Sequence, residues 1–148
     1  FRPYGIEMIE GCELVRVALD KHGTPVSRIV KIALQMIGRQ SPGLRLVVSF
    51  ADTRMGHLGS IYQAGNWVYV GETKPKFDFE LDGQILQRRS YTGSNFGGTR
   101  RRVPPGAVKV ESPPKHRYLY PLDKAMAAQI EPLRQPYPKR ERADEATK

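Results

Sequence analysis

Runs of apolar residues separated by turn signals predict alternating strands and helices in the first half of the chain. Within residues 12–20, a nearly continuous apolar run is typical of a buried strand and consists of Leu14, Val15, Val17, Ala18 and Leu19. Residues 24–40 instead repeat apolar side chains at helical spacing. A second apolar run predicts a strand over 44–52. A short helix within 53–66 then leads into a third strand over 67–73. This alternation indicates an α/β fold whose first two strands are parallel and joined by a right-handed crossover.

The pattern changes in the second half of the chain. Residues 76–91 predict a β-hairpin with its turn at the Asp-Gly pair 82–83. Residues 92–107 contain glycines, prolines and arginines without periodicity and predict a loop. The segment 115–133 is expected to run from a strand into a short helix. The tail 134–148 is rich in proline and then of mixed charge, so we expect it to be disordered.

The composition fits one soluble globular domain. The chain has 148 residues, of which 39% are hydrophobic and 26% charged, and this length suffices for a real core. No run of about 18 apolar residues occurs, so no transmembrane helix is expected. Cys12 is the sole cysteine, which excludes an internal disulfide and argues against a cysteine-based zinc site. His22, His57 and His116 show no recognisable metal-ligand spacing.

Positive charge is concentrated in the second half of the chain. The net charge is +9 overall, with +3 in residues 1–75 and +6 in residues 76–148. The densest window, 88–117, sets eight basic residues against Glu111 alone. Tyrosines and glycines are interleaved with this charge, so nucleic acid is the favoured partner, because each neutralised phosphate releases counterions. The alternative is a solvated basic loop.

Two stretches of the chain resemble known families. YQAGNW at 62–67 is close to the Y-x-x-x-G-F element of GNAT acetyltransferases, in which a short helix bearing a tyrosine turns into a strand. A closer resemblance covers most of residues 3–126. The segments PYGIEMIEGCELVRVALDKHGTPVSRIV, SPGLRLVVSFADTRMGHLGSIYQAGNWVYVG and KHRYLYPLDKAM, in this order, resemble the Mom family, the GNAT-like DNA-modification proteins of phage Mu and its relatives.

The resemblance implies a fold, an activity and a location. It implies a GNAT-like α/β (α+β) domain over 1–133, with a mixed central sheet and helices on both faces. The implied reaction transfers a carbamoylmethyl-type group to the N6 amine of adenine in double-stranded DNA, in the bacterial host cytoplasm, and protects phage DNA from restriction. Relatives have additional residues before the position of Phe1, so we expect this chain to be a fragment that lacks the N-terminal strands of such a fold.

Other functions stay open at this point. One alternative is an acetyl-CoA-dependent N-acetyltransferase that acts on a protein or a small amine. Another is an inactive DNA-binding remnant of a truncated gene. The oligomeric state is also open, and a homodimer is one of the possibilities.

Three residues are candidates for catalysis. The resemblance implies that Tyr62 is the acid that protonates the departing thiolate, and the alternative is a tyrosine packed beneath the sheet. Ser49 and Asp52 end the second predicted strand, where ligands of open α/β sheets gather, and we expect them to orient the adenine amine. The alternative role of Asp52 is an Asx cap of the following loop. Trp67 is best explained as a core residue.

An anion site is expected where the helix predicted from residue 24 begins. Thr24 is the expected N-cap and Pro25 the first helical residue. Gly23, Thr24, Ser27 and Arg28 are expected to bind phosphate there, because a helix N-terminus favours anions. The turn departs from the GNAT pattern Gln/Arg-x-x-Gly-x-Gly/Ala, since it has one glycine and Pro25 lacks an N–H donor. The cofactor is therefore unknown. Acetyl-CoA, a related acyl donor and iron are compatible with the resemblance.

DNA contacts are expected from the basic window and its neighbours. Adenine N6 is paired in the duplex, so its modification requires a flipped base, and Tyr91 suits stacking. Alternation puts His116, Tyr118 and Tyr120 on one face of a strand, as a cleft wall or an amphipathic edge. Asn66 can pair with adenine. The expected DNA-binding residues are Asn66, Arg88, Arg89, Tyr91, Arg100, Arg101, Arg102, Lys115, Arg117 and Tyr118.

Overall fold

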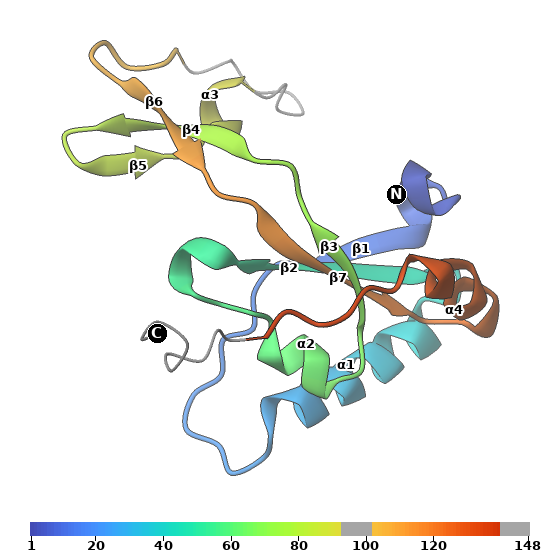
Figure 1. The fold of residues 1–148 in the computed structure, drawn as a ribbon. Helices are drawn as coiled ribbons and strands as arrows, with labels where there is room; N and C mark the ends of the chain where they lie inside the picture. The colour runs from blue at the N-terminus through green and yellow to red at the C-terminus, as the bar shows by residue number, and fades with distance from the viewer. Residues whose placement is uncertain (93–101, 140–148) are drawn as a thin grey trace, which may run out of the picture. The chain divides into compact units, whose positions relative to one another are not determined.

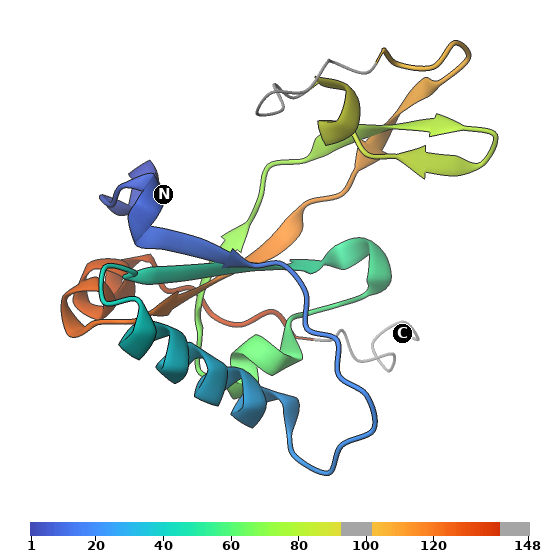
Figure 2. The same cartoon turned by 180° about the vertical axis from the view of Figure 1, so that it is seen from behind.

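The computed structural model describes residues 1–92 and 102–139, and the chain divides into two compact units. The first unit combines Phe1–Thr73 with Lys115–Lys148, and the second is Lys74–Pro114. Figure 1 and Figure 2 show the elements of each unit from opposite sides. Within the described residues, no helix has the length and apolar character needed to cross a bilayer.

A four-stranded mixed sheet forms the centre of the first unit (Figure 1). Its strands are β1 (Gly11–Leu14), β2 (Leu46–Asp52), β7 (Lys115–Pro121) and β3 (Val68–Glu72), in that spatial order. β1 runs parallel to β2, whereas β7 is antiparallel to both β2 and β3. The parallel pairing of the first two strands confirms the sequence-based prediction, and the combination of helices with a mixed sheet confirms the broad α/β class.

Helices cover both faces of this sheet, as expected (Figure 2). α1 (Val26–Gln40) and α2 (Ser60–Ala64) pack on one face, and α4 (Lys124–Ile130) packs on the other. Val47 belongs to the core beneath α1, and its neighbour Leu46 belongs to the core beneath α4. Successive side chains of a strand point to opposite faces, so the apolar run of β2 supplies both cores.

Short elements and caps connect these parts. Asp123 caps α4, because its Oδ1 accepts a hydrogen bond from the backbone N–H of Met126 at 2.7 Å. The predicted cap of α1 was wrong: Pro25 is the N-cap, its ψ of 132° keeps the backbone extended, and the carbonyl of Thr24 accepts from Nδ1 of His22 at 2.6 Å. The remaining elements are η1 (Arg2–Tyr4), η2 (Met8–Glu10), η3 (Thr53–Met55), α3 (Arg89–Thr92) and η4 (Glu131–Leu133).

The first strand is shorter than the sequence indicated. β1 ends at Leu14, and the predicted continuation of the strand to residue 20 was wrong. The pairing of β1 with β2 ends at Leu14 and Ser49, so the chain after Leu14 leaves the sheet. Val15 is 80% exposed, and Val15 and Val17 line a cleft. The apolar run therefore combines a short strand with a cleft wall.

The second unit is a three-stranded antiparallel sheet. Its spatial order is β5 (Gln84–Leu86), β4 (Lys76–Leu81) and β6 (Val108–Ser112). β4 and β5 form the predicted hairpin. Asp82 and Gly83 have φ angles of 50° and 75°, as a two-residue hairpin turn with two left-handed residues requires.

Candidate active-site cleft

A cleft of about 860 Å³ opens where β1 and β2 part. The last residue pair that the two strands share is Leu14 opposite Ser49. β2 continues to Asp52, paired with β7 alone. The lining comes from four segments of the first unit: 15–17, 50–52, 56–63 and 138–139.

Tyr62 of α2 lines this cleft, and its hydroxyl is tied to the sheet. The Oη of Tyr62 lies 2.7 Å from the Oγ of Ser49, which lies 2.7 Å from the backbone carbonyl oxygen of Leu14. A serine hydroxyl has one proton and a carbonyl can only accept, so Ser49 donates to Leu14 and Tyr62 donates to Ser49. Ser49 is fully buried, which places it behind Tyr62 and out of direct contact with a substrate amine. The phenol proton is thus held at the point where the strands part.

Tyr62 belongs to the core and also lines the cleft. Its ring is a core element, with centroids 5.0 Å from Trp67 and 5.2 Å from Tyr118. The residue is 7% exposed and still lines the cleft. Trp67, at 1% exposure, is the core residue that the sequence indicated. The aromatic packing fixes the ring, and the hydrogen bond to Ser49 fixes its hydroxyl.

Asp52 ends β2 as an ionised carboxylate in the same cleft. Its Oδ2 lies 3.2 Å from Nζ of Lys115, and its Oδ1 accepts from the backbone N–H of Arg54 at 3.0 Å. Burial raises the pKa of Asp52, but the hydrogen bonds and charges of Lys115 and Arg54 outweigh this effect and hold the pKa below its ordinary value. The carboxylate is therefore a hydrogen-bond acceptor and a weak base. Asp52 also caps η3, which confirms the capping alternative.

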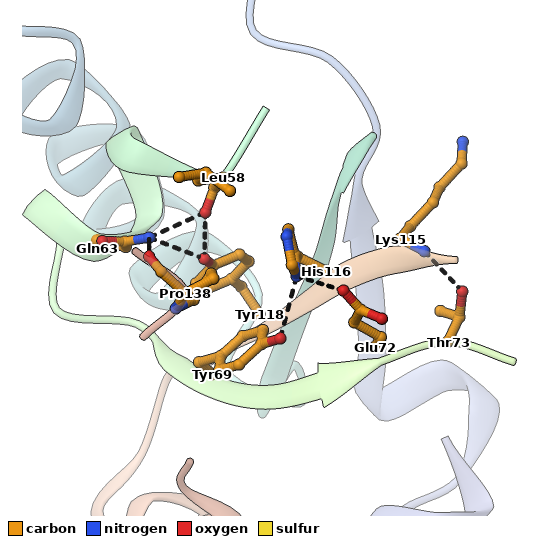
Figure 3. Close-up of polar contacts among 9 residues, drawn as sticks. All are labelled: Leu58, Gln63, Tyr69, Glu72, Thr73, Lys115, His116, Tyr118 and Pro138. Atoms are coloured by element: carbon orange, nitrogen blue, oxygen red, sulfur yellow. Dashed lines mark hydrogen bonds and ion pairs between the residues drawn. The ribbon is translucent and has the colours of Figure 1, made fainter. Parts of the chain in front are cut away.

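A second hydrogen-bond network holds the loop before α2 (Figure 3). The hydroxyl of Tyr118 donates to the backbone carbonyl of Leu58, and Nε2 of Gln63 donates to both groups, at 3.2 Å and 2.9 Å respectively. Burial raises the pKa of Tyr118, and the hydrogen bond from Gln63 opposes this shift. Tyr118 was expected to contact DNA, but it has no exposed surface. The rings of Tyr62, Tyr69 and Tyr137 pack around it. Its role in this structure is to support the cleft.

His116 lies in a further polar group on the same sheet face (Figure 3). Its Nδ1 is 3.0 Å from the Oη of Tyr69 and 3.5 Å from Oε1 of Glu72. An irregularity in the register of β3 between Tyr69 and Glu72 brings Glu72 opposite His116. Burial, together with the charge of Glu72, raises the pKa of Tyr69. Strand alternation correctly predicted the side of His116, whereas nothing in the sequence singled out Tyr69 or Glu72.

The residues that follow η4 form part of the site. We define the C-terminal strap as residues 134–139, which were expected to belong to a disordered tail. The N–H of Gln135 donates to the carbonyl of Tyr69 at 2.8 Å, and the hydroxyl of Tyr137 donates to the carbonyl of Trp67 at 2.6 Å. Gln63 also donates to the carbonyl of Pro138 at 3.3 Å. The strap is therefore ordered against β3 and α2, and residues 140–148 lie outside the described part of the chain.

Comparison with known proteins gives the family. The sequence matches the model of the Mom protein family over residues 4–139. The chain belongs to the Mom protein family. It is also similar to methylcarbamoylase mom of Escherichia phage Mu, with 32% identity over 119 residues. That match covers 76% of this chain and 49% of the phage Mu protein, so the chain spans about half the length of this relative. The resemblance to the Mom family drawn from the sequence is confirmed.

The expected anion site of this Mom family member lies away from the cleft lining. Gly23, Thr24 and Arg28 are exposed around the start of α1, and Ser27 is half-buried in its first turn. None of the four residues belongs to the lining segments. Their role toward a donor stays a prediction.

In the second unit, the expected DNA-binding residues lie around aromatic rings. The guanidinium of Arg88 and the ammonium of Lys109 lie 5.1 Å and 4.9 Å from the ring centroid of Phe77. The ring of Tyr91 packs edge-on against Phe79 at 6.0 Å. Arg102 is exposed, whereas Arg100, Arg101 and the side chain of Arg89 lie outside what the structure describes.

In the first unit, three expected DNA-binding residues have distinct surroundings. Asn66 is exposed, in a left-handed conformation with φ of 56° at the turn into β3. The ammonium of Lys115 is compensated by Asp52. Nη1 of Arg117 donates to the Oη of Tyr4 at 3.1 Å, on the sheet face that α4 covers. Lys115 is exposed as well, whereas Arg117 is half-buried.

The described ranges 1–92 and 102–139 contain no group of three or more His, Cys, Asp or Glu side chains placed to hold a metal ion. No metal ligand is therefore assigned.

Proposed function

We propose that this chain is the part of a phage DNA-modifying enzyme that contains the acceptor site, and that it transfers a carbamoylmethyl-type group to the N6 amine of adenine. The observation that carries the proposal is the Tyr62 hydroxyl, held at the base of a cleft between two diverging strands. Family membership supports the reaction class, because the phage Mu relative is named a methylcarbamoylase. The site of action is proposed to be the cytoplasm of the bacterial host.

The tyrosine is proposed to act as the general acid. Transfer forms a bond between adenine N6 and the carbon of the incoming group and breaks the bond to the leaving group, which takes the phenol proton of Tyr62. The proton that N6 loses passes to solvent, and the phenolate of Tyr62 regains a proton from solvent after the transfer. Ser49 then has a second task. Its hydroxyl can turn from the carbonyl of Leu14 to the phenolate, so that the new negative charge receives a hydrogen bond at once.

Asp52 is proposed to orient the amine by accepting a hydrogen bond from it. Its pKa lies below the ordinary value, so it is a poor proton acceptor but a constant negative partner for an N–H group. Lys115 and the backbone N–H of Arg54 each engage one carboxylate oxygen, and each oxygen can accept a further hydrogen bond from a ligand in the cleft. This role is to align the nitrogen with the reacting carbon.

The base is proposed to enter the cleft flipped out of the duplex. The N6 amine is a Watson–Crick donor that also faces the major groove, and a base stacked in the duplex cannot enter a cleft. A volume of about 860 Å³ is within the usual range for a small-molecule site and accommodates a purine and part of a donor. Exposed Asn66 and the basic residues of the second unit are proposed to contact the surrounding DNA.

The fold is proposed to be a GNAT-like one. Support comes from the order β1, α1, β2, α2, β3, in which a long helix follows the first strand and a short helix presents Tyr62 before the third. An acyl donor related to acetyl-CoA is proposed on the same basis, with the turn at 23–28 as its anion site. The proposal for the donor is tested separately from that for the acceptor.

A nucleoside digest tests the reaction. DNA from bacterial cells that express the protein is hydrolysed and analysed by liquid chromatography and mass spectrometry, with cells expressing the Tyr62→Phe variant as the matched control. We expect an adenine nucleoside that is heavier by one carbamoylmethyl group, at a level that the variant lowers sharply. Unmodified adenine together with normal DNA binding would contradict the enzymatic role and favour a DNA-binding remnant.

A further inference from the structure

Two basic side chains at the cleft have no acidic partner within the described part of the chain. Arg16 belongs to the segment that leaves β1, and Lys139 ends the C-terminal strap. Both are exposed and both line the cleft, from segments far apart in the sequence. Among residues 1–92 and 102–139, neither makes an ion pair. Two cations therefore face the same space from different walls.

The acid in the cleft does not cancel these charges. Asp52 is the one acidic side chain among the described lining residues, and Lys115 lies 3.2 Å from it outside the lining. The carboxylate is thus neutralised by a third cation. His57 adds a further group that can donate to an anion. The balance of charge around the cleft is therefore positive and favours a negatively charged ligand.

The backbone that carries Lys139 is held in place. The strap is fixed by the hydrogen bonds of Gln135 to Tyr69 and of Tyr137 to Trp67, and by Gln63 on the carbonyl of Pro138. A cation that starts from an ordered backbone loses less conformational freedom when it binds. Arg16 lies two residues beyond Leu14, the last residue of β1.

We infer that Arg16 and Lys139 form a phosphate-binding rim of the cleft. A guanidinium can hold two phosphate oxygens at once, and an ammonium adds a compact charge from another lining segment. The inference rests on the proposed function, in which the ligand is a nucleotide of a DNA strand with a phosphate on each side of the base. A phosphorylated donor carries the same chemistry, so the experiment separates the two sources.

Binding measured without turnover tests the rim. The probes are a single-stranded nonanucleotide with one central adenine, and coenzyme A, each titrated at several salt concentrations. The variants are Arg16→Gln, Lys139→Gln and the double substitution. Lys124→Gln is the matched control, because Lys124 is exposed at the start of α4 and does not line the cleft. If the strand supplies the phosphate, each rim variant lowers the salt slope for the oligonucleotide by about 0.7, and the double variant by about 1.4.

The outcomes are distinct. A lower slope for the oligonucleotide assigns the rim to a strand phosphate, and a loss of affinity for coenzyme A alone assigns it to the donor. Rim variants that match Lys124→Gln with both probes overturn the inference. Because turnover is not required, lower slopes with no modified adenine would keep the rim and reject the proposed reaction. Modified adenine with unchanged slopes and affinities would reject the rim and keep the proposed reaction.

Discussion

The hydroxyl of Ser49 lies 2.7 Å from that of Tyr62 and links α2 to the last pair of residues shared by β1 and β2. The same oxygen lies 2.7 Å from the carbonyl of Leu14, so one buried serine connects both strands and the helix. A tyrosine on a helix of five residues has little intrinsic order, because so short a helix is unstable alone. The hydrogen bond and the surrounding rings supply that order.

Removing the Tyr62 hydroxyl should abolish most activity and leave the fold intact. Tyr62→Phe keeps the ring against Trp67 and Tyr118, and Ser49 keeps its carbonyl acceptor, so stability should fall by about 1 kcal/mol. Loss of a general acid should lower modification at least about 100-fold. Nucleoside analysis and urea unfolding measure the two effects, and a fully active phenylalanine variant would reject the acid role.

Ser49→Ala should show the signature of a positioning residue. The substitution leaves the Tyr62 hydroxyl and the Leu14 carbonyl without their partner, at a cost of about 1–3 kcal/mol in unfolding free energy. Because Ser49 is fully buried, we expect a lower kcat with little change in KM for DNA. A large rise in KM at constant kcat would mean that Ser49 contacts the substrate instead.

A methyl group at Gly59 should destabilise the support of the cleft. Its Cβ would lie 2.4 Å from a ring carbon of Tyr118, and the φ of 75° is itself unfavourable for alanine. Gly56 is the matched control, because it has a similar φ of 67° and open space around it. Gly59→Ala should lower the unfolding free energy by about 1–3 kcal/mol more than Gly56→Ala. Equal effects in thermal or urea unfolding would show that the backbone angle alone matters.

The ion pair of Asp52 and Lys115 should contribute stability that disappears in acid. The folded pKa of Asp52 is lowered, so its contribution is present above the unfolded value near 3.9 and is lost as pH falls through the folded value. Both side chains are more than a third exposed, which limits the pair to under about 1 kcal/mol. Lys115→Met should therefore be less stable than wild type at pH 7 and no different near pH 2. An equal difference at both pH values would place its origin in packing.

The C-terminal strap should depend on one phenol. Tyr137→Phe removes the 2.6 Å hydrogen bond to the carbonyl of Trp67 and should cost about 1 kcal/mol. Tyr120→Phe is the control, since Tyr120 packs on the same core and makes no hydrogen bond through its hydroxyl within the described residues. Equal urea midpoints for the two variants would argue against a stabilising role for the strap.

Much of the first unit could be predicted from its sequence. The strand over 44–52, the strand–helix segment 115–133 and the sheet face of His116 follow from apolar periodicity, and the structure agrees within a few residues. In the second unit, the hairpin turn at 82–83 follows from the need of such turns for left-handed residues. These features depend on local backbone preference and on burial, which periodicity reports directly.

The parts that could not be predicted depend on tertiary contacts. Periodicity could not show that β1 stops at Leu14, because an apolar cleft wall and a buried strand have the same pattern. The strap was read as disordered from its prolines, yet Tyr137 anchors it to a carbonyl 70 residues away. Ser49 and Tyr62 were both selected as candidates, but their hydrogen bond requires the folded approach of α2 to β2.

The unequal lengths of β1 and β2 have a consequence for how such a site could be lost or gained. β2 has seven residues and β1 has four, and the cleft begins where the shorter strand stops. Continued in the same register, Val15 would pair with Phe50 and Arg16 with Ala51. Two more pairs would draw two of the four lining segments, 15–17 and 50–52, together and narrow the cleft. The opening thus depends on the length of β1 as well as on the side chains that line it.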